Sequence, residues 1–413
     1  MKIIQKPLKS ILNCEVCGNT SLKPVLNLGK HPMCDDLVPV GDPRVCKEYP
    51  IEILYCNVCR TGHQKFQVPK EELFPKSYHY RSRFTADVLS GMSGLVDSCV
   101  DKFGSLDKRI VLDIGCNDGS LLDFFKEKSA VTIGIEPTDA SKDAELKGHQ
   151  VYSDYLSVDL AEKILKAYGH PDIITFTNVF AHIEDLAGVL ASLKVLQDKN
   201  TKIVIENHYL GAVLDGNQFD TFYHEHPRTY SFTSFKFMAK TLGINLEAVE
   251  FPSRYGGNIR VFMGLNSQMN NQSALNDLDD RESLFEGQFE ELKSNIEKWL
   301  ISKGSILKST FEHHGKIRAK AFPGRSAILV KMLNIDENMI SAVYEKPGSL
   351  KIDHYVPGTR IPILSDDDLL ASDNLEKPLL NLAWHISKEI HGYLVKSGYV
   401  GPITDILDSD DFI

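Results

Sequence analysis

The stretch Val111-Leu-Asp-Ile-Gly-Cys-Asn-Asp-Gly-Ser-Leu-Leu122 decides the fold of the central part of the chain. Its apolar first residues predict a buried strand over 110–114, and the pattern that starts at Leu121 predicts an amphipathic helix. Gly115 and Gly119 lie between the two, so we expect a strand, a tight turn and a helix. Gly115 allows the turn. We expect Gly119 to let a ligand approach the first free amides of the helix.

A second apolar run, 131–135, follows about twenty residues after the first and ends in Glu136. A carboxylate at a strand tip accepts hydrogen bonds from both hydroxyls of a ribose, as in nucleotide-binding folds. A dinucleotide site would want GxGxxG, but the middle glycine that admits a pyrophosphate is absent here. The spacing instead resembles motif I of class I S-adenosylmethionine-dependent methyltransferases. The resemblance implies cofactor contacts from the following residues: Asp113, Gly115, Asn117, Gly119, Ser120, Leu121, Glu136 and Pro137.

Length and composition bound the remaining possibilities. The chain has 413 residues, enough for two to three domains. Its net charge of -10 argues against nucleic acid or an anionic membrane as the main partner. No window reaches the ~18 apolar residues of a membrane span, and residues 1–12 lack the apolar run of a signal peptide. We therefore expect a cytoplasmic protein. Nothing in the sequence decides the oligomeric state, and we take a monomer as the expectation.

Four of the eight cysteines form two Cys-x-x-Cys pairs, Cys14/Cys17 and Cys56/Cys59. Two knuckle turns of this kind present four thiolates, which predicts a closed tetrahedral Zn²⁺ site that is structural because no position is left for substrate. Two redox dithiols fit poorly, since no thioredoxin-like βαβ pattern surrounds either pair. Cys34 and Cys46 lie between the pairs and are the competing ligands.

Strands and helices alternate from Arg109 to about Leu265, which predicts a parallel sheet with helices on both faces. The expected strands are 110–114, 131–135, 149–152, 172–176, 201–206, 246–251 and 259–264. Ligands bind beyond the carboxyl ends of such strands. Four groups fall there: the loop 115–119, Glu136, the run 178–182 and the run 206–209.

The run Tyr223-His-Glu-His226 is the densest group of proton donors and acceptors in the chain. A His-x-His metal site, a general-base cluster and a solvated turn are all compatible with it. If the run is extended, His224 and His226 face one way. The metal interpretation lacks a further ligand, whereas a base suits histidine, whose pKa lies near neutrality. His182 fits either a core position or the cleft. Tyr78 and Tyr80 share one side of an extended segment, where ordinary packing explains them equally well.

The cysteine knuckles, motif I, the run Asn178-Val-Phe-Ala-His-Ile183, the YHEH stretch and Tyr255-Gly-Gly-Asn-Ile-Arg260 resemble, in this order, the sugar C-methyltransferases of deoxysugar biosynthesis. The resemblance implies an α/β protein with a zinc-binding domain (1–75), a class I Rossmann-like methyltransferase domain (76–265) and a second Rossmann-like α/β domain (266–413). The run 351–362 resembles the family's KxGxxxPGTxIP segment. The loop 322–327 departs from the family's Gly-Tyr-Gly-Ala pattern, and Pro323 removes an amide donor there. The expected helices are one of amphipathic character ending near Phe103, a long one starting near Phe285, and one over 379–396.

The resemblance implies transfer of a methyl group from S-adenosylmethionine to C3 of a nucleotide-linked 4-keto-6-deoxyhexose. A base removes the proton next to the ketone, and the enolate carbon attacks the methyl group. We assign the base to His226, with Tyr223 and Glu225 positioning it or relaying the proton. Tyr78 or Tyr80 and His182 donate to the enolate oxygen or hold the sugar. Asn178 faces the methionine part of the cofactor, and the expected substrate contacts are Asn207, Tyr209, His224, Arg260 and Lys351. An O- or N-methyltransferase and a non-catalytic zinc-binding interaction module are the alternatives.

Overall fold

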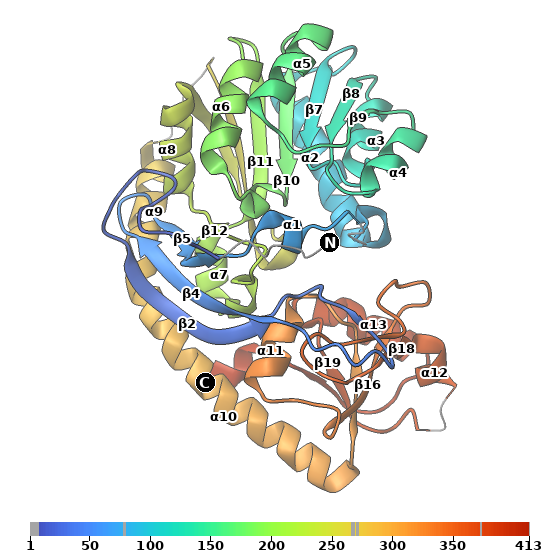
Figure 1. The fold of residues 1–413 in the computed structure, drawn as a ribbon. Helices are drawn as coiled ribbons and strands as arrows, with labels where there is room; N and C mark the ends of the chain where they lie inside the picture. Colours follow the sequence, from blue (N-terminus) through green and yellow to red (C-terminus); the bar gives the residue numbers. More distant parts are fainter. Residues whose placement is uncertain (1–7, 77–79, 266–268, 270–271, 372–373, 413) are drawn as a thin grey trace. The chain divides into compact units, whose positions relative to one another are not determined.

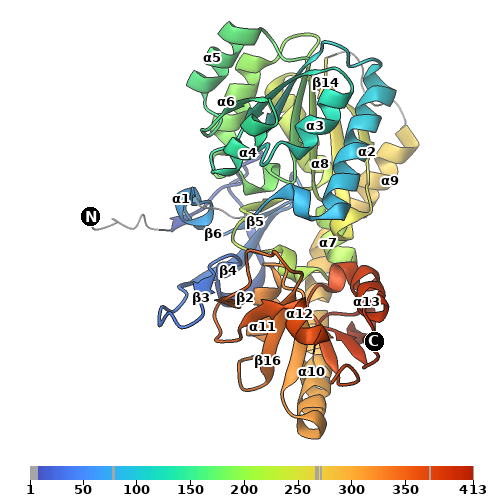
Figure 2. The same ribbon diagram turned by 90° about the vertical axis from the view of Figure 1, so that its right-hand side faces the viewer.

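The structure is a computed structural model that describes residues 8–76, 80–265, 269, 272–371 and 374–412. The chain forms two compact units (Figures 1 and 2). Unit 1 comprises Met1–Pro24, Leu54–Val213 and Glu225–Glu286, and unit 2 comprises Val25–Ile53, Leu214–His224 and Gly287–Ile413. The domain boundaries expected at residues 75 and 265 stay a prediction.

A seven-stranded sheet forms the centre of unit 1, with the strand order β13-β14-β11-β10-β7-β8-β9. All seven strands predicted in this region are present, and their ends differ from the prediction by at most two residues. Continuous apolar runs, buried on both faces, mark the central strands clearly. The strands are β7 (Ile110–Ile114), β8 (Val131–Ile135), β9 (Gln150–Tyr152), β10 (Ile173–Thr177), β11 (Lys202–His208), β13 (Asn245–Glu250) and β14 (Asn258–Gly264).

The expectation of a wholly parallel sheet is wrong at one strand. β14 runs antiparallel to both of its neighbours, β11 and β13. Only residues 251–257 connect β13 to β14. A connection this short joins antiparallel strands, whereas a parallel pair needs a crossover of a dozen or more residues.

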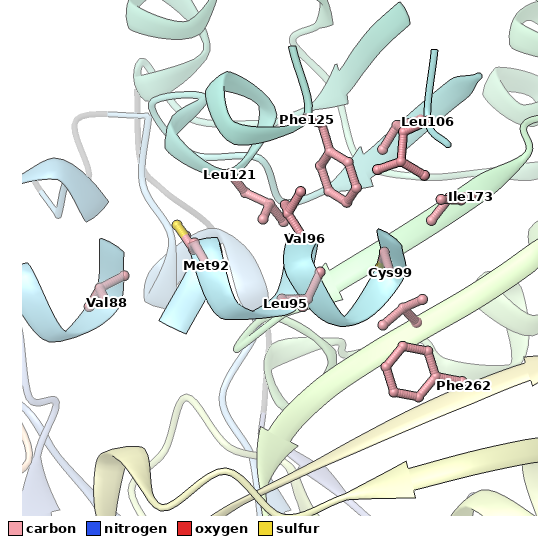
Figure 3. Close-up of a cluster of buried hydrophobic side chains, with 12 residues drawn as sticks. Val88, Met92, Leu95, Val96, Cys99, Leu106, Leu121, Phe125, Ile173 and Phe262 are labelled. Carbon is pink, nitrogen blue, oxygen red and sulfur yellow. The ribbon is translucent and has the colours of Figure 1, made fainter. Parts of the chain in front are cut away.

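Helices cover both faces of this sheet, with α2 (Ala86–Phe103) and α3 (Ser120–Glu127) on one face and α5 (Val158–Tyr168) and α6 (Leu186–Leu196) on the other (Figure 2). Apolar side chains of α2 and α3 pack with those of β7, β10, β11 and β14 into one buried cluster. Figure 3 shows Leu121 and Phe125 of α3 beside Val96 of α2 in this cluster. The cluster holds α3 against the face of the sheet, and it therefore holds the loop that precedes α3 at the carboxyl end of β7. The remaining helices of this unit are α4 (Ala140–Leu146), α7 (Leu210–Asp215), α8 (Phe232–Leu242) and α9 (Gln272–Ser283).

The N-terminal part of unit 1 consists of short strands and turns. β1 (Lys9–Ser10) pairs with β6 (Phe66–Gln67), and β5 (Thr61–Gln64) pairs with β12 (Arg228–Thr229). The second pairing joins the cysteine-rich region to the chain that directly follows the YHEH stretch. Other elements of the first 75 residues are β2 (Lys23–Pro32), β3 (Val38–Pro39), β4 (Glu48–Cys56) and α1 (Lys70–Leu73).

A second, parallel sheet forms the centre of unit 2, with the order β18-β16-β15-β19-β20. The helix expected over 379–396 is wrong in its first part. The residues Leu379–Asn381 form strand β19, and the helix α13 starts only at Ser387. Leu379 and Leu380 pair with β15 on one side and β20 on the other, so sheet pairing outweighs their helix propensity. The other elements are β15 (Ile317–Lys320), β16 (Ile340–Glu345), β17 (His354–Tyr355), β18 (Ile363–Ser365), β20 (Ile403–Asp405), α11 (Ser326–Met332), α12 (Asp366–Leu370) and α13 (Ser387–Lys396).

The long helix predicted from about Phe285 is confirmed as α10 (Phe285–His314). Its apolar side chains recur at spacings of three and four, and Phe289, Leu292 and Trp299 are fully buried. Over the described part of the chain, no helix is both long enough and apolar enough to cross a membrane.

Candidate functional site

The loop between β7 and α3 turns sharply at Gly115, as the sequence predicted. Gly115 has a φ of +73°, a conformation that costs little only for glycine. A Cβ atom at this position would lie 2.6 Å from both terminal methyl carbons of Val179. The amides of Gly115 and Cys116 donate to the carbonyl of Ile135 at 2.7 and 3.1 Å, which ties the loop to the end of β8.

The role predicted for Gly119, to let a ligand approach the first free amides of α3, stays a prediction. The amide of Gly119 donates to the carbonyl of Cys116 at 2.9 Å, and the amide of Ser120 faces a carboxylate oxygen of Asp118 at 3.2 Å. The amides of Gly119 and Ser120 are therefore paired within the loop. A Cβ atom at Gly119 would lie 2.9 Å from Cβ of Ala144 and 2.8 Å from the ring of His149. Gly119 thus serves the close packing of the start of α3 against α4.

Glu136 lies at the tip of β8 and is 6% exposed. One carboxylate oxygen accepts from the amide of Asn117 at 3.0 Å, and the other accepts from the amide and hydroxyl of Thr138 at 2.9 and 2.6 Å. An ionised carboxylate offers about four acceptor positions, so these three bonds leave room for one more donor. The geometry fits a carboxylate that is fixed in place and receives a ligand hydroxyl.

Asp113 is buried one residue before the end of β7. The hydroxyl of Thr175 on the neighbouring strand β10 donates to it at 2.7 Å. Burial raises the pKa of Asp113 from its ordinary value to about 7, and the single hydrogen bond from Thr175 offsets this only in part. Asp113 therefore changes charge near neutral pH.

Residues 80–83, which precede α2, are hydrogen-bonded to the β7–α3 loop. The side-chain amide of Asn117 donates to the carbonyl of Tyr80 at 3.2 Å, and its oxygen accepts from the amide of Ser82 at 3.1 Å. Asp118 accepts from the amide of Arg83 at 3.0 Å. Tyr80 is thereby brought next to the loop, as its predicted role requires, with 41% of its surface exposed. Tyr78 lies outside the described residues.

Other residues predicted for the cofactor have the following surroundings. The side chain of Leu121 belongs to the hydrophobic cluster of Figure 3, so only its backbone can face a ligand. The hydroxyl of Ser120 donates to Asp118 at 2.6 Å. Asn178 follows β10 with a φ of +54° and accepts from the side chain of Asn258 at 3.2 Å. Pro137 follows Glu136 directly and is partly buried.

Three histidines meet in unit 1. The ring of His226 lies 4.9 Å, centroid to centroid, from that of His182, which ends the short 3-10 turn Phe180–His182. It lies 5.4 Å from the ring of His208, the last residue of β11. His226 is 4% exposed. The sequence pointed to the neighbours Asn207 and Tyr209 but not to His208. The signal was present, because His208 falls in the run that was expected to end a strand.

The tautomer of His182 follows from its partner. Its Nδ1 atom lies 2.9 Å from the carbonyl oxygen of Glu225, and a carbonyl only accepts, so Nδ1 carries the proton. Burial lowers the pKa of His182 to about 4, so the ring is neutral at pH 7 and Nε2 is an acceptor. A donor role toward an enolate oxygen does not fit this tautomer. Acceptance of a hydrogen bond from a sugar hydroxyl does.

The YHEH stretch is not extended. His224 and Glu225 form a turn, so the expectation that His224 and His226 face one way fails. Nε2 of His224 donates to the carbonyl of Tyr49 at 3.0 Å within unit 2, and burial lowers the pKa of His224 to about 4. His224 therefore packs as a buried histidine. Tyr223 belongs to unit 2 as well and is partly buried.

Two residues predicted to contact substrate are committed to protein partners. Tyr209 is 1% exposed, and its hydroxyl donates to Glu282 at 3.0 Å. Arg260 is 5% exposed and pairs with Glu206 at 2.7 Å and with Glu250 at 2.9 Å. Both arrangements favour a structural role.

Asn207 and Lys351 differ in this respect. Asn207 is 1% exposed at the end of β11, and both polar atoms of its side-chain amide lack a hydrogen-bond partner, so it retains the capacity to bind a ligand. Lys351 donates to the carbonyl of Phe322 at 2.7 Å, in the loop that departs from the family pattern.

The two cysteine pairs come together as the sequence predicted. Sulfur atoms of Cys14 and Cys59 are 3.3 Å apart, and those of Cys17 and Cys56 are 3.6 Å apart. Zn–S bonds of about 2.3 Å in a tetrahedron place sulfurs about 3.8 Å apart, so the set fits Zn²⁺. Within the described residues, these four thiols are the one group of three or more metal-ligating side chains that could hold an ion, and neither Cys34 nor Cys46 belongs to it. The pKa of Cys56 is lowered mainly by a hydrogen bond from Cys14, whose own pKa is raised to about 12.

Comparisons with known families agree with this organisation. A "Putative zinc binding domain" matches residues 14–74, a "Methyltransferase domain" residues 79–249, and a "C-methyltransferase C-terminal domain" residues 253–397. The chain is 24% identical over 402 residues to the C-methyltransferase NovU of Streptomyces niveus, with 94% of this chain and 93% of NovU covered.

Solved structures give partial matches. The PH0226 protein of Pyrococcus horikoshii is 15% identical with a TM-score of 0.37, covering 48% of this chain and 98% of its own. The magnesium protoporphyrin IX methyltransferase of Synechocystis, solved with bound S-adenosylmethionine, is 13% identical with a TM-score of 0.33, covering 44% of this chain and 80% of its own. The fold predicted from the sequence, a class I methyltransferase unit flanked by a cysteine-rich N-terminal region and a C-terminal α/β region, is confirmed by the family matches and the strand order.

Proposed function

Because the chain belongs to the C-methyltransferases that join a zinc-binding, a methyltransferase and a C-terminal C-methyltransferase domain, we propose that it methylates C3 of a nucleotide-linked 4-keto-6-deoxy sugar. The observation that carries the proposal is the group of His182, His208 and His226, in which His226 is buried and the other two are partly buried. All three lie in loops or strand ends at the carboxyl edge of the sheet, where ligands of such folds bind.

Methylation of carbon requires a base because a C–H bond is not nucleophilic. A carbon next to a ketone loses a proton far more readily, since the charge moves onto the ketone oxygen. In this proposal, the imidazole of His226 takes the proton, and the two electrons of the C–H bond become those of the enolate. The enolate carbon then forms the new C–C bond. S-adenosylmethionine, when bound, would supply the methyl group as an electrophile, since its methyl–sulfur bond breaks as the C–C bond forms and the electron pair of that bond stays on the departing sulfur.

The neighbours of His226 fit this task. His182 is neutral at pH 7, so it adds no positive charge that would oppose protonation of His226. A carboxylate oxygen of Glu225 lies 3.9 Å from Nδ1 of His182, close enough to favour a positive charge in the group. Tyr80 is exposed beside the cofactor loop and donates a hydrogen bond to the substrate. Tyr223 precedes the turn His224–Glu225 and positions His226. The free amide of Asn207 binds a sugar hydroxyl or the ketone.

The cofactor lies against the β7–α3 loop in this proposal. One ribose hydroxyl binds Glu136, whose position is fixed by Asn117 and Thr138. Gly115 has no side chain and lets the loop turn sharply at the end of β7. Asn117 holds the segment Tyr80–Phe84 next to this loop through its hydrogen bond to the carbonyl of Tyr80. The four cysteines hold Zn²⁺ as a structural ion.

Proton exchange in deuterated buffer tests the proposal. The enzyme should exchange the C3 proton of a nucleotide 4-keto-6-deoxy sugar in the presence of S-adenosylhomocysteine, and NMR of the methylated product should show a new C–C bond. His226→Asn should reduce both exchange and turnover about 10²- to 10⁴-fold, with S-adenosylhomocysteine affinity retained.

His170→Asn is the matched control. His170 is exposed and bonds to the carbonyl of Leu196, so both rates should stay at the wild-type level. Full exchange in His226→Asn removes His226 from the mechanism. A methyl group on oxygen or nitrogen overturns the C-methylation of a sugar.

A further inference from the structure

Arg228 lies two residues after His226, at the start of β12, and its side chain is fully buried. A buried guanidinium is costly unless each of its groups finds a partner. Its Nε atom donates to the hydroxyl of Tyr230 at 2.9 Å, and one terminal nitrogen pairs with the carboxylate of Glu15. The other terminal nitrogen donates to the carbonyl of Ile183, and it lies 3.3 Å from that of Glu184.

These partners come from two separate parts of the site. Glu15 stands between Cys14 and Cys17, inside the first cysteine knuckle. Ile183 directly follows His182. The Arg228 side chain therefore connects the first cysteine knuckle to the turn that carries His182. The Arg228 backbone follows that of His226 after one intervening residue. Burial would lower the pKa of Arg228, but Tyr230 and Glu15 outweigh it and raise the pKa, so the guanidinium stays charged.

The second knuckle contacts the same stretch of chain. The carbonyl of Cys59 accepts from the hydroxyls of Ser231 at 3.3 Å and Ser234 at 3.2 Å. The amide of Gln64 on β5 donates to the carbonyl of Pro227 at 2.9 Å, where β5 and β12 pair. Residues 227–234 are thus held by both knuckles.

Two cross-links then fix the two catalytic histidines relative to each other. His182 donates from Nδ1 to the carbonyl of Glu225, and Arg228 donates to the carbonyl of Ile183. The two hydrogen bonds join the segment 182–183 to the segment 225–228 at two separate points. Without the Arg228 bond, only the bond from His182 to Glu225 joins these two segments, so the segments can shift and change the contact that sets the orientation and tautomer of the His182 ring.

We propose that Arg228 is a positioning residue through which the cysteine knuckles set the orientation of His182 and His226. The catalytic meaning of this orientation rests on the proposed function, whereas the structural link does not. The cysteine-rich region then acts on the reaction through geometry, without contributing a ligand to the substrate. A misplacement of about 1 Å at a reacting group costs about 100-fold in rate, so the expected loss is large.

Arg228→Met tests the link, because methionine fills much of the volume and cannot donate. We expect kcat to fall about 10- to 100-fold. The zinc content should stay at the wild-type value, and the affinity for S-adenosylhomocysteine should change less than twofold. The ¹⁵N NMR shifts of His182 should change from those of the pure Nδ1-protonated form to those of a mixture. This spectroscopic measurement needs no substrate, so it stands even where His226 proves not to be the base.

Two further variants keep the test decisive. Glu15→Gln retains an oxygen acceptor and should show the same changes at smaller size, and it replaces Arg228→Met if that variant does not fold. Lys202→Met removes another largely buried, ion-paired cation of unit 1, at the start of β11 and so at the opposite end of the sheet. It should leave the His182 tautomer and kcat unchanged.

Two results would overturn the proposed positioning role of Arg228. An unchanged His182 tautomer in a folded Arg228→Met or Glu15→Gln protein overturns the proposal. Parallel loss of zinc, cofactor affinity and kcat overturns it too, because such a pattern reports general destabilisation.

Discussion

Replacement of Gly115 by alanine tests whether the β7–α3 loop is shaped by packing as well as by backbone conformation. The φ of +73° costs an alanine about 1–2 kcal/mol. The added Cβ atom would lie 2.6 Å from both terminal carbons of Val179, and overpacking of this kind costs about 1–3 kcal/mol. We therefore expect Gly115→Ala to lower the free energy of unfolding by about 2–5 kcal/mol.

Gly243 supplies a matched control, since its φ is +72° and no atom lies within 4 Å of a Cβ built there. Gly243→Ala should cost only the backbone contribution of about 1–2 kcal/mol. Urea denaturation followed by circular dichroism measures both variants, and calorimetry with S-adenosylhomocysteine measures the loop directly. Gly115→Ala should weaken this affinity, and Gly243→Ala should not.

The double variant Gly115→Ala/Val179→Ala removes the two methyl carbons that the new Cβ would contact. It should recover part of the lost cofactor affinity. If Gly115→Ala costs no more stability than Gly243→Ala, then Val179 does not confine this loop and the reasoning is refuted.

Three further predictions concern charge and metal. Burial raises the pKa of Asp113 from 3.8 to about 7, so between these pH values the folded protein keeps a proton that the unfolded chain has lost. The contribution of Asp113 to the free energy of unfolding is therefore full below pH 4 and falls by at most about 4 kcal/mol as the pH rises to 7. Asp113→Asn should flatten this dependence in urea titrations at several pH values. A slope equal to that of wild type would contradict the burial of this carboxyl. Cys56→Ser should reduce bound zinc, measured by atomic absorption, together with the melting temperature, and a zinc-free variant of wild-type stability would exclude a structural metal. Glu136→Gln should weaken S-adenosylhomocysteine binding by about 1.5–3 kcal/mol in calorimetry, with kcat retained at saturating cofactor, whereas unchanged affinity would place the ribose elsewhere.

The sequence predicted the central strands well because they are continuous apolar runs between glycine-rich turns. It did not predict the reversal of β14, which depends on the length of the connection between two strands and not on their composition. It also gave the wrong element at Leu379–Asn381, whose short apolar run fits a helix or a strand until its pairing partners are known.

The candidate site was predictable by residue type and only partly by role. The four cysteines and Glu136 follow from spacing, whereas His226 follows from the group of polar residues around it and from the family resemblance, and its role stays a prediction. The function of Gly119 depends on Ala144 and His149, and the tautomer of His182 depends on the carbonyl of Glu225, so neither is visible in a local pattern. Arg228 carries no motif of its own, and its importance appears only from the contacts of its buried guanidinium.

The assignment of chain segments to the two units limits how the protein can be divided in the laboratory. The backbone changes unit five times, after Pro24, Ile53, Val213, His224 and Glu286. A fragment made by cutting at one or two points cannot contain all of one unit without also carrying pieces of the other, so truncated versions should expose unpaired strands and aggregate. Chimaeras between relatives should exchange the whole set of segments of one unit together. The same interleaving makes the folding of each unit wait for chain that is synthesised long after its first residues.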